Sequence, residues 1–120
     1  MLVAEHGGVG LLLNAMRRFE GSVHMQESGC GAIGAIAATV PENKAAIIVA
    51  GGLHVVCAAM AAFPDNRDFQ EYAVSAIQGV VWNLPPLIDA ALEAGVEPLL
   101  RHAADLGLEN AVQQLQRMGI

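Results

Sequence analysis

The chain repeats itself at a spacing of 44 residues, and this internal repeat constrains the fold more than any other feature of the sequence. Matching residues occur in the same order in successive copies: Gly7-Gly8 with Gly51-Gly52, Ala15-Met16 with Ala59-Met60, Phe19 with Phe63, Gln26-Glu27 with Gln70-Glu71, Ala32-Ile33 with Ala76-Ile77, Pro41 with Pro85, and Ala50-Gly51 with Ala94-Gly95. Helical repeats of about 40 to 47 residues are typical of α-solenoids, in which each unit buries its apolar face against its neighbours. The 120 residues therefore hold a little under three units of one domain, at about 1–40, 41–84 and 85–120.

Each unit is predicted to contain a short helix, a second helix and a longer third helix. The segment Thr39-Val-Pro-Glu42 matches a capping box, and Asn83 with Pro85 repeats the cap 44 residues later. A short helix should therefore begin near residue 41 and again near residue 85. Glycines at 51–52 and at 95 should end these short helices, because glycine readily takes the left-handed conformation. We expect second helices at 11–18, 53–62 and 98–106, and third helices at 23–38, 67–83 and 109–118.

The amino-acid composition excludes several classes of protein. Hydrophobic residues make up 54% of the chain, which excludes disorder, and two cysteines are too few for a disulfide-dense secreted module. With only 4% aromatic residues, the interior must be built from small and aliphatic side chains on closely packed helices. The net charge of −6 argues against a nucleic-acid partner, since binding phosphates requires a basic surface.

The N-terminal residues show no export signal, so we expect a cytoplasmic protein, with the nucleus also open. Residues 45–64 contain no Lys, Arg, Asp or Glu, and twenty such positions are long enough to be a membrane span. Gly51, Gly52 and His54 interrupt this stretch, and its equivalent recurs 44 residues away. We therefore predict no membrane span, but two buried helices joined by a glycine turn.

The order short helix, Gly-Gly, helix, loop, long helix resembles the armadillo repeat over essentially the whole chain. The segments PENKAAIIVAGGL and NRDFQEYAVSAIQGVV carry the resemblance. HEAT repeats are similar but have two helices per unit. The resemblance implies a right-handed superhelix of three-helix units, which binds peptides or partner helices on a concave face lined by the third helices and has no catalytic activity.

The sequence offers no convincing catalytic, cofactor or metal site. Gly29, Gly31 and Gly34 match a dinucleotide-binding pattern by letter, but they lie inside a predicted helix rather than at a strand-to-helix turn, so we interpret them as points of close helix approach. Cys30 and Cys57 align with apolar positions and are expected to be inert core thiols. The four histidines lack metal-ligand spacing, and no nucleophile context is present.

The third helix of the middle unit has two different faces. The side expected to be core carries Phe69, Ala73, Ala76, Ile77 and Val80. In the second helices, Met16 and Met60 are also expected to be core residues. The opposite stripe contains the only tyrosine and the only tryptophan: Asp68, Glu71, Tyr72, Ser75, Gln78, Gly79 and Trp82. This stripe is a candidate anchor site on a concave face, although Trp82 could instead pack on the turn at Pro85-Pro86.

Armadillo proteins of the importin-alpha type grip an extended peptide with a Trp and an Asn four residues apart on each third helix. The aligned positions here depart from that pattern: Gly31 and Ala35, Ser75 and Gly79, Gln113 and Arg117. A floor of small residues suits a bulkier partner, such as an amphipathic helix.

Acidic residues recur near the starts of the third helices, at Glu27, Glu71 and Glu109. They have two open explanations. Carboxylates there are favoured by the helix dipole, or they form an acidic groove that selects a partner with basic residues.

Two function classes follow: a protein-interaction scaffold that uses the concave stripe, or a structural segment that stacks within a longer armadillo array or self-assembles. The N-terminal end lacks a preceding long helix, so we expect homo-oligomerisation through apolar residues there, namely Leu2, Leu11, Leu12 and Leu13. The apolar stripe of 109–118 is instead suited to a capping helix with a polar outer face.

Overall fold

A computed structural model describes residues 8–39, 42–82 and 85–120, and these residues form eight α-helices and no strand. The helices are α1 Gly8–Arg18, α2 Val23–Thr39, α3 Glu42–Val49, α4 Gly52–Ala62, α5 Arg67–Val81, α6 Pro85–Glu93, α7 Val96–Asp105 and α8 Glu109–Met118. The prediction of an all-α chain is confirmed.

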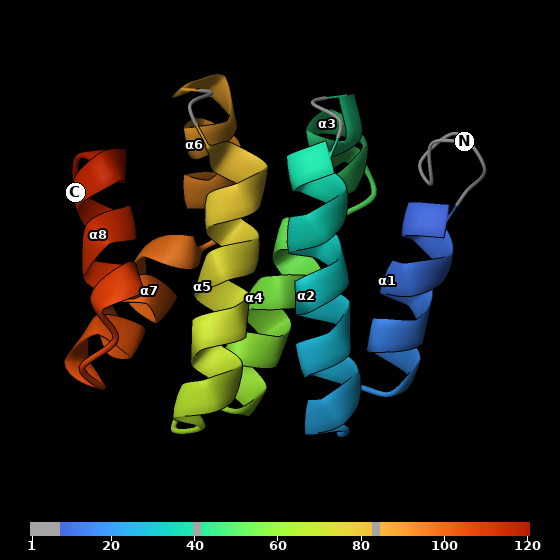
Figure 1. Cartoon of the computed structure of the whole chain (residues 1–120), viewed down its shortest axis with the longest axis horizontal. Helices are drawn as coiled ribbons and strands as arrows, with labels where there is room; N and C mark the ends of the chain where they lie inside the picture. Colours follow the sequence, from blue (N-terminus) through green and yellow to red (C-terminus); the bar gives the residue numbers. More distant parts are fainter. Residues whose placement is uncertain (1–7, 40–41, 83–84) are drawn as a thin grey trace.

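The helices are arranged in two layers with two short helices at one end (Figure 1). The long helices α2 and α5 lie side by side, and α8 follows α5 at one edge of the molecule. Behind them α4 packs against α1 on one side and α7 on the other. Equivalent helices of successive units therefore contact each other, as the internal repeat requires.

Glycine turns join the short helices to the second helices, as predicted. Gly51 has φ 85° and Gly95 has φ 92°, and both immediately precede the second helix of their unit. Among the described helices none is long and apolar enough by itself to cross a membrane. Only α3 and α4 taken together would satisfy length and composition, and this pair is bent by 64°.

The starts of the third helices are capped in the same way in two units. Ser22 Oγ accepts a hydrogen bond from Met25 N at 3.2 Å, and Asn66 Oδ1 accepts one from Phe69 N at 3.0 Å. These two caps are 44 residues apart, so a polar side chain satisfies the same free amide in each unit.

The predicted capping box at Thr39 is wrong. Thr39 is the last residue of α2, and its hydroxyl donates a 2.7 Å hydrogen bond to the carbonyl oxygen of Ala35. A threonine hydroxyl competes readily for the carbonyl one turn earlier, so it closes α2 rather than opening α3. The equivalent predicted cap at Asn83 lies outside the described residues.

Buried glutamines clamp the loop between the second and third helices in two units. Gln26 Nε2 donates to the carbonyl oxygens of Met16 and Phe19, both at 3.0 Å. Gln70 Nε2 donates to the equivalent carbonyls, Met60 at 3.0 Å and Phe63 at 2.8 Å. Each glutamine thus joins the carbonyl of the last turn of a second helix, Met16 or Met60, to the carbonyl of the following loop, Phe19 or Phe63. The loop carbonyls also accept a backbone amide, from Ser22 at 2.9 Å and from Asn66 at 3.3 Å. This pattern explains why a polar residue is buried at a repeated position.

The core lies between the two layers and is built from aliphatic, alanine and sulfur-containing side chains with Phe69 at its centre. The predicted core residues Met16, Met60 and Ile77 are all at most 1% exposed, which confirms their assignment. Cys30 and Cys57 are also buried, as predicted. Burial raises the pKa of the Cys30 thiol to about 12 and that of Cys57 to about 11, so both stay protonated and unreactive near neutral pH.

Candidate partner-binding groove

A groove of about 620 Å³ runs along the solvent-exposed side of the α2–α5 pair. Its floor consists almost entirely of small side chains, and its rim carries two aromatic rings and a lysine. The lining residues are Cys30, Gly31, Gly34, Ala35 and Ala38 from α2, Lys44 from α3, and Tyr72, Ser75, Ala76, Gln78, Gly79 and Trp82 from α5.

Glycine allows the two long helices to approach closely beneath the groove. A Cβ atom at Gly79 would lie 3.4 Å from the carbonyl oxygen of Gly34, and one at Gly34 would lie 3.7 Å from Ala76 Cα. The predicted close approach therefore occurs at Gly34. Gly31 behaves differently, since a Cβ atom there would meet nothing within 4 Å. Gly31 thus leaves open space in the groove instead of admitting a neighbouring helix.

Two aromatic side chains of α5 border the groove. Tyr72 is 51% exposed and Trp82 is 49% exposed, which is unusual for the two largest aromatic residues of a small chain. The guanidinium of Arg117, from α8, lies 4.5 Å from the centre of the Trp82 ring, and Lys44 Nζ donates to the Trp82 carbonyl oxygen at 3.3 Å. The indole is therefore partly covered by a cation from the next unit, an arrangement that sequence reasoning missed.

An acidic depression of about 440 Å³ continues the groove at the N-terminal ends of α2 and α5. It is lined by Glu27, Asp68, Glu71, Tyr72 and Ser75, and it shares the last two residues with the groove. Within the described part of the chain, none of its three carboxylates forms an ion pair within 4.0 Å. The depression therefore presents uncompensated negative charge next to an apolar floor.

The predicted partner-binding residues of the three third helices fall into three sets. Seven line the groove: Gly31, Ala35, Tyr72, Ser75, Gln78, Gly79 and Trp82. Three more, Glu27, Asp68 and Glu71, line the depression. Glu109 and Gln113 are exposed on α8 but line neither hollow.

Lys44 was not among the predicted site residues. It belongs to a short helix, far from the stripe in sequence, and only the packing of α3 beside the C-terminal ends of α2 and α5 brings it to the groove. No periodicity within one helix contains that information.

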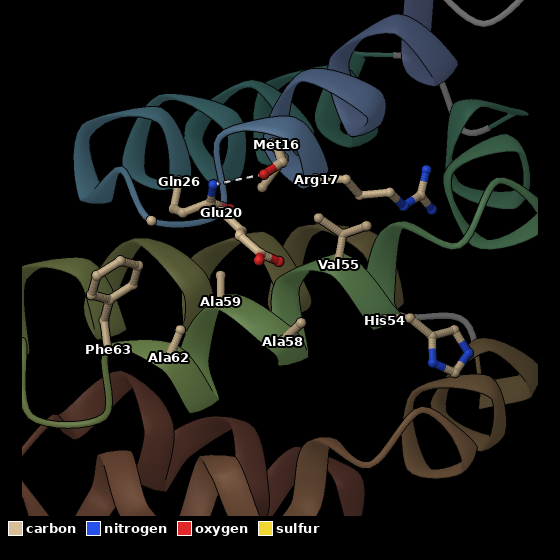
Figure 2. Close-up of a pocket in the computed structure, with 11 residues that line it drawn as sticks. Met16, Arg17, Glu20, Gln26, His54, Val55, Ala58, Ala59, Ala62 and Phe63 are labelled. Atoms are coloured by element: carbon tan, nitrogen blue, oxygen red, sulfur yellow. Dashed lines mark hydrogen bonds between the residues drawn. The ribbon is translucent and has the colours of Figure 1, made fainter.

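A second hollow of about 590 Å³ lies between α1 and α4 (Figure 2). Small side chains of α4, including Val55, Ala58 and Ala62, face it. The residues 44 positions later are Leu99 and His102 in α7 and Leu106 directly after it, and His102 Nε2 lies 2.9 Å from the carbonyl oxygen of Pro64. The first junction between second helices therefore has smaller side chains at these positions than the next one, and the aromatic ring that lines it, Phe63, is partly buried against the core.

The predicted self-association residues differ in exposure. Leu11 is 71% exposed and Leu12 is half-buried, whereas Leu13 is completely buried; Leu2 lies outside the described residues. The inclusion of Leu13 in an association surface is wrong, because helical spacing places it with Val9 and Met16 on the face of α1 that contacts the core.

Within residues 8–39, 42–82 and 85–120, no group of three His, Cys, Asp or Glu side chains could hold a metal ion. No protein-family model matches the chain, and comparison with curated proteins and with solved structures found no significant similarity. The α2–α5 groove and its acidic extension are thus the features from which a function can be argued.

Proposed function

We propose that the chain is a protein-interaction module of the armadillo type, which binds an amphipathic helix in the α2–α5 groove. One observation carries the proposal: an open groove with a floor of glycine and alanine is bordered by Tyr72 and Trp82, each about half exposed. Exposed aromatic side chains next to a shallow apolar pocket are the usual anchors of protein interfaces.

The armadillo assignment rests on repeated local structure. Successive units share the glycine turn before the second helix, the N-cap of the third helix and the glutamine clamp between them. These features support a right-handed solenoid of three-helix units, in which α2, α5 and α8 line one surface.

The shape of the groove favours a helical partner over an extended peptide. An extended peptide needs side-chain amides placed to bond its backbone, and the small residues Gly31, Ala35, Ser75 and Gly79 occupy those positions. A helix satisfies its own backbone and inserts apolar side chains at spacings of three and four residues into such a floor.

A second role, stacking on another copy or within a longer array, is favoured by Leu11, which is 71% exposed at the outer edge of α1. This role and helix binding use different surfaces and are compatible.

The groove can be tested with a designed amphipathic helix of about 14 residues that contains no tryptophan. Trp82 is the only tryptophan of the chain, so its fluorescence reports events at the groove rim. We expect a saturable change in Trp82 emission on titration. Gly31→Leu should fill the groove and weaken binding at least tenfold without loss of stability, since Gly31 is exposed and a Cβ atom there meets nothing within 4 Å.

Ala61→Leu is the matched control, because Ala61 is exposed on α4 and lines none of these hollows. Trp82→Ala, measured by calorimetry, should cost ~2 kcal/mol or more of binding free energy while helicity is retained. Binding that is insensitive to both Gly31→Leu and Trp82→Ala would contradict the proposal.

A further inference from the structure

The charged residues that line the groove and its extension are separated along its length. Asp68 lies in the first turn of α5, and Glu27 and Glu71 lie at the fifth residue of α2 and of α5, so all three are near the N-terminal ends of these helices. Lys44 lies at the other end, near the last turns of the same two helices, where Arg117 also covers Trp82. The groove is thus negative at its beginning and positive at its end.

The cations near the groove do not neutralise its negative end, and those at its positive end keep free donors. The guanidinium of Arg67, on the first turn of α5, lies beside Gly107 in the loop before α8, where a Cβ atom would be 3.6 Å from Arg67 Nη2. Arg67 does not line the acidic depression. Lys44 and Arg117 each use Trp82 as a partner, which leaves further N–H donors on both cations.

The groove has the length of a short helix. From Asp68 to Trp82 the helix rises about 21 Å at 1.5 Å per residue, and from Glu27 to Ala38 about 16 Å. A partner helix of about 11 to 14 residues would therefore reach from the three carboxylates to Lys44.

We infer that the partner, on the proposed function above, is an amphipathic helix that binds in one direction only, with basic residues over Glu27, Asp68 and Glu71 and acidic residues beside Lys44. A free-standing helix is stabilised by acidic residues in its first turn and basic residues in its last turn, because of its dipole. The partner's N-terminus therefore lies at the Lys44 end, and the partner runs antiparallel to α2 and α5. Complementary charges fix its direction and register.

The direction can be measured by energy transfer from Trp82, which marks the positive end of the groove. The probe is a 14-residue helix with Glu in its first turn, Lys in its last turn and an apolar stripe between them. One version carries a dansyl group at its N-terminus, and a second carries it at its C-terminus. At saturation we expect clearly greater transfer to the N-terminal label. Equal transfer, or greater transfer to the C-terminal label, would overturn the inference.

Variants that remove the carboxylate charges test charge complementarity separately from binding to the apolar floor of the groove. The double variant Asp68→Asn with Glu71→Gln should bind the unlabelled probe about five- to tenfold more weakly in low salt, and the difference should shrink in 0.5 M salt. Glu93→Gln on α6 is the control, since Glu93 is exposed and lines neither hollow.

The outcomes distinguish the two proposals. Binding without directional preference, or binding unaffected by the neutral variants, refutes the directed helix and leaves the groove as a binding site. Absence of binding by either labelled probe, with Gly31→Leu indistinguishable from the unmodified chain, refutes the binding site and the directed helix together.

Discussion

The buried glutamines show how a single side chain fixes a connection between helices. Gln70 is 1% exposed and donates to two carbonyl oxygens at the end of α4, and Gln26 does the same at the end of α1. No apolar residue of similar size could satisfy these carbonyls, and unpaired polar groups in the interior are costly.

We predict that Gln70→Ala lowers the free energy of unfolding by about 2 to 3 kcal/mol, because one buried and one partly buried hydrogen bond are lost and a cavity is left. Urea denaturation followed by circular dichroism measures the change. Gln116→Ala, at an exposed position of α8, should change stability by no more than about 0.5 kcal/mol. Similar small effects at both positions would show that the clamp does not hold the loop.

Single residues also show where sequence reasoning succeeds and fails. Helical spacing correctly predicted Met16, Met60 and Ile77 as core, since burial follows the face of a helix. It missed that Leu13 belongs to the same buried face as Met16, because the prediction of association through α1 treated its adjacent leucines as one exposed surface. It also missed the Arg117–Trp82 contact, which depends on how α8 packs against α5.

At the scale of elements, glycines in α2 serve two opposite purposes. Gly29 lies under the fully enclosed Met16 side chain, with which a Cβ atom would collide, whereas Gly31, on the exposed side, has open space above it. The two positions are two residues apart on one helix, so they provide a matched pair.

We predict that Gly31→Ala raises the free energy of unfolding by about 0.5 to 1 kcal/mol through helix propensity alone. Gly29→Ala should lower it by about 1 to 3 kcal/mol, since Met16 must move within a packed core. Thermal denaturation of both variants shows whether each substitution raises or lowers the free energy of unfolding. Stabilisation by Gly29→Ala would mean that Met16 adapts freely and that α1 and α2 are not tightly packed there.

The helices themselves were the most predictable part of the fold. The internal repeat and the glycine turns predicted the eight described helices with starts or ends displaced by only a few residues, because caps and periodicity are local signals. The groove was predicted as a concave surface on the three third helices, but its depth arises from the Gly34–Gly79 crossing and its positive end from α3. The depth of the groove and its positive end depend on contacts between helices, which a periodic pattern within one helix does not contain.

At the scale of the whole molecule, the two edges differ in exposed apolar side chains. On α1, Leu11 is 71% exposed, whereas on α8 the largest exposed apolar side chain is Val112 at 40%. We expect copies of the chain to associate through the α1 edge, and Leu11→Glu to shift the light-scattering mass toward a monomer of 12.5 kDa.

Val112→Glu is the control at the opposite edge and should leave the mass unchanged. Leu13→Glu is unsuitable for this purpose, because Leu13 is buried and a charge there would unfold the chain. A monomer at all concentrations in the unmodified chain would exclude association through α1.

The position of Trp82 has a consequence for communication along the molecule. Its ring borders the groove and is covered by Arg117 of α8, so under the proposed function the same side chain contacts the partner helix and packs against the last helix of the chain. Any ligand that favours one orientation of the indole changes the free energy of that attachment, and by thermodynamic reciprocity a change at α8 alters the affinity of the groove by the same factor. The proposed binding in the α2–α5 groove therefore implies an energetic coupling between the groove and the packing of α8, through one aromatic ring.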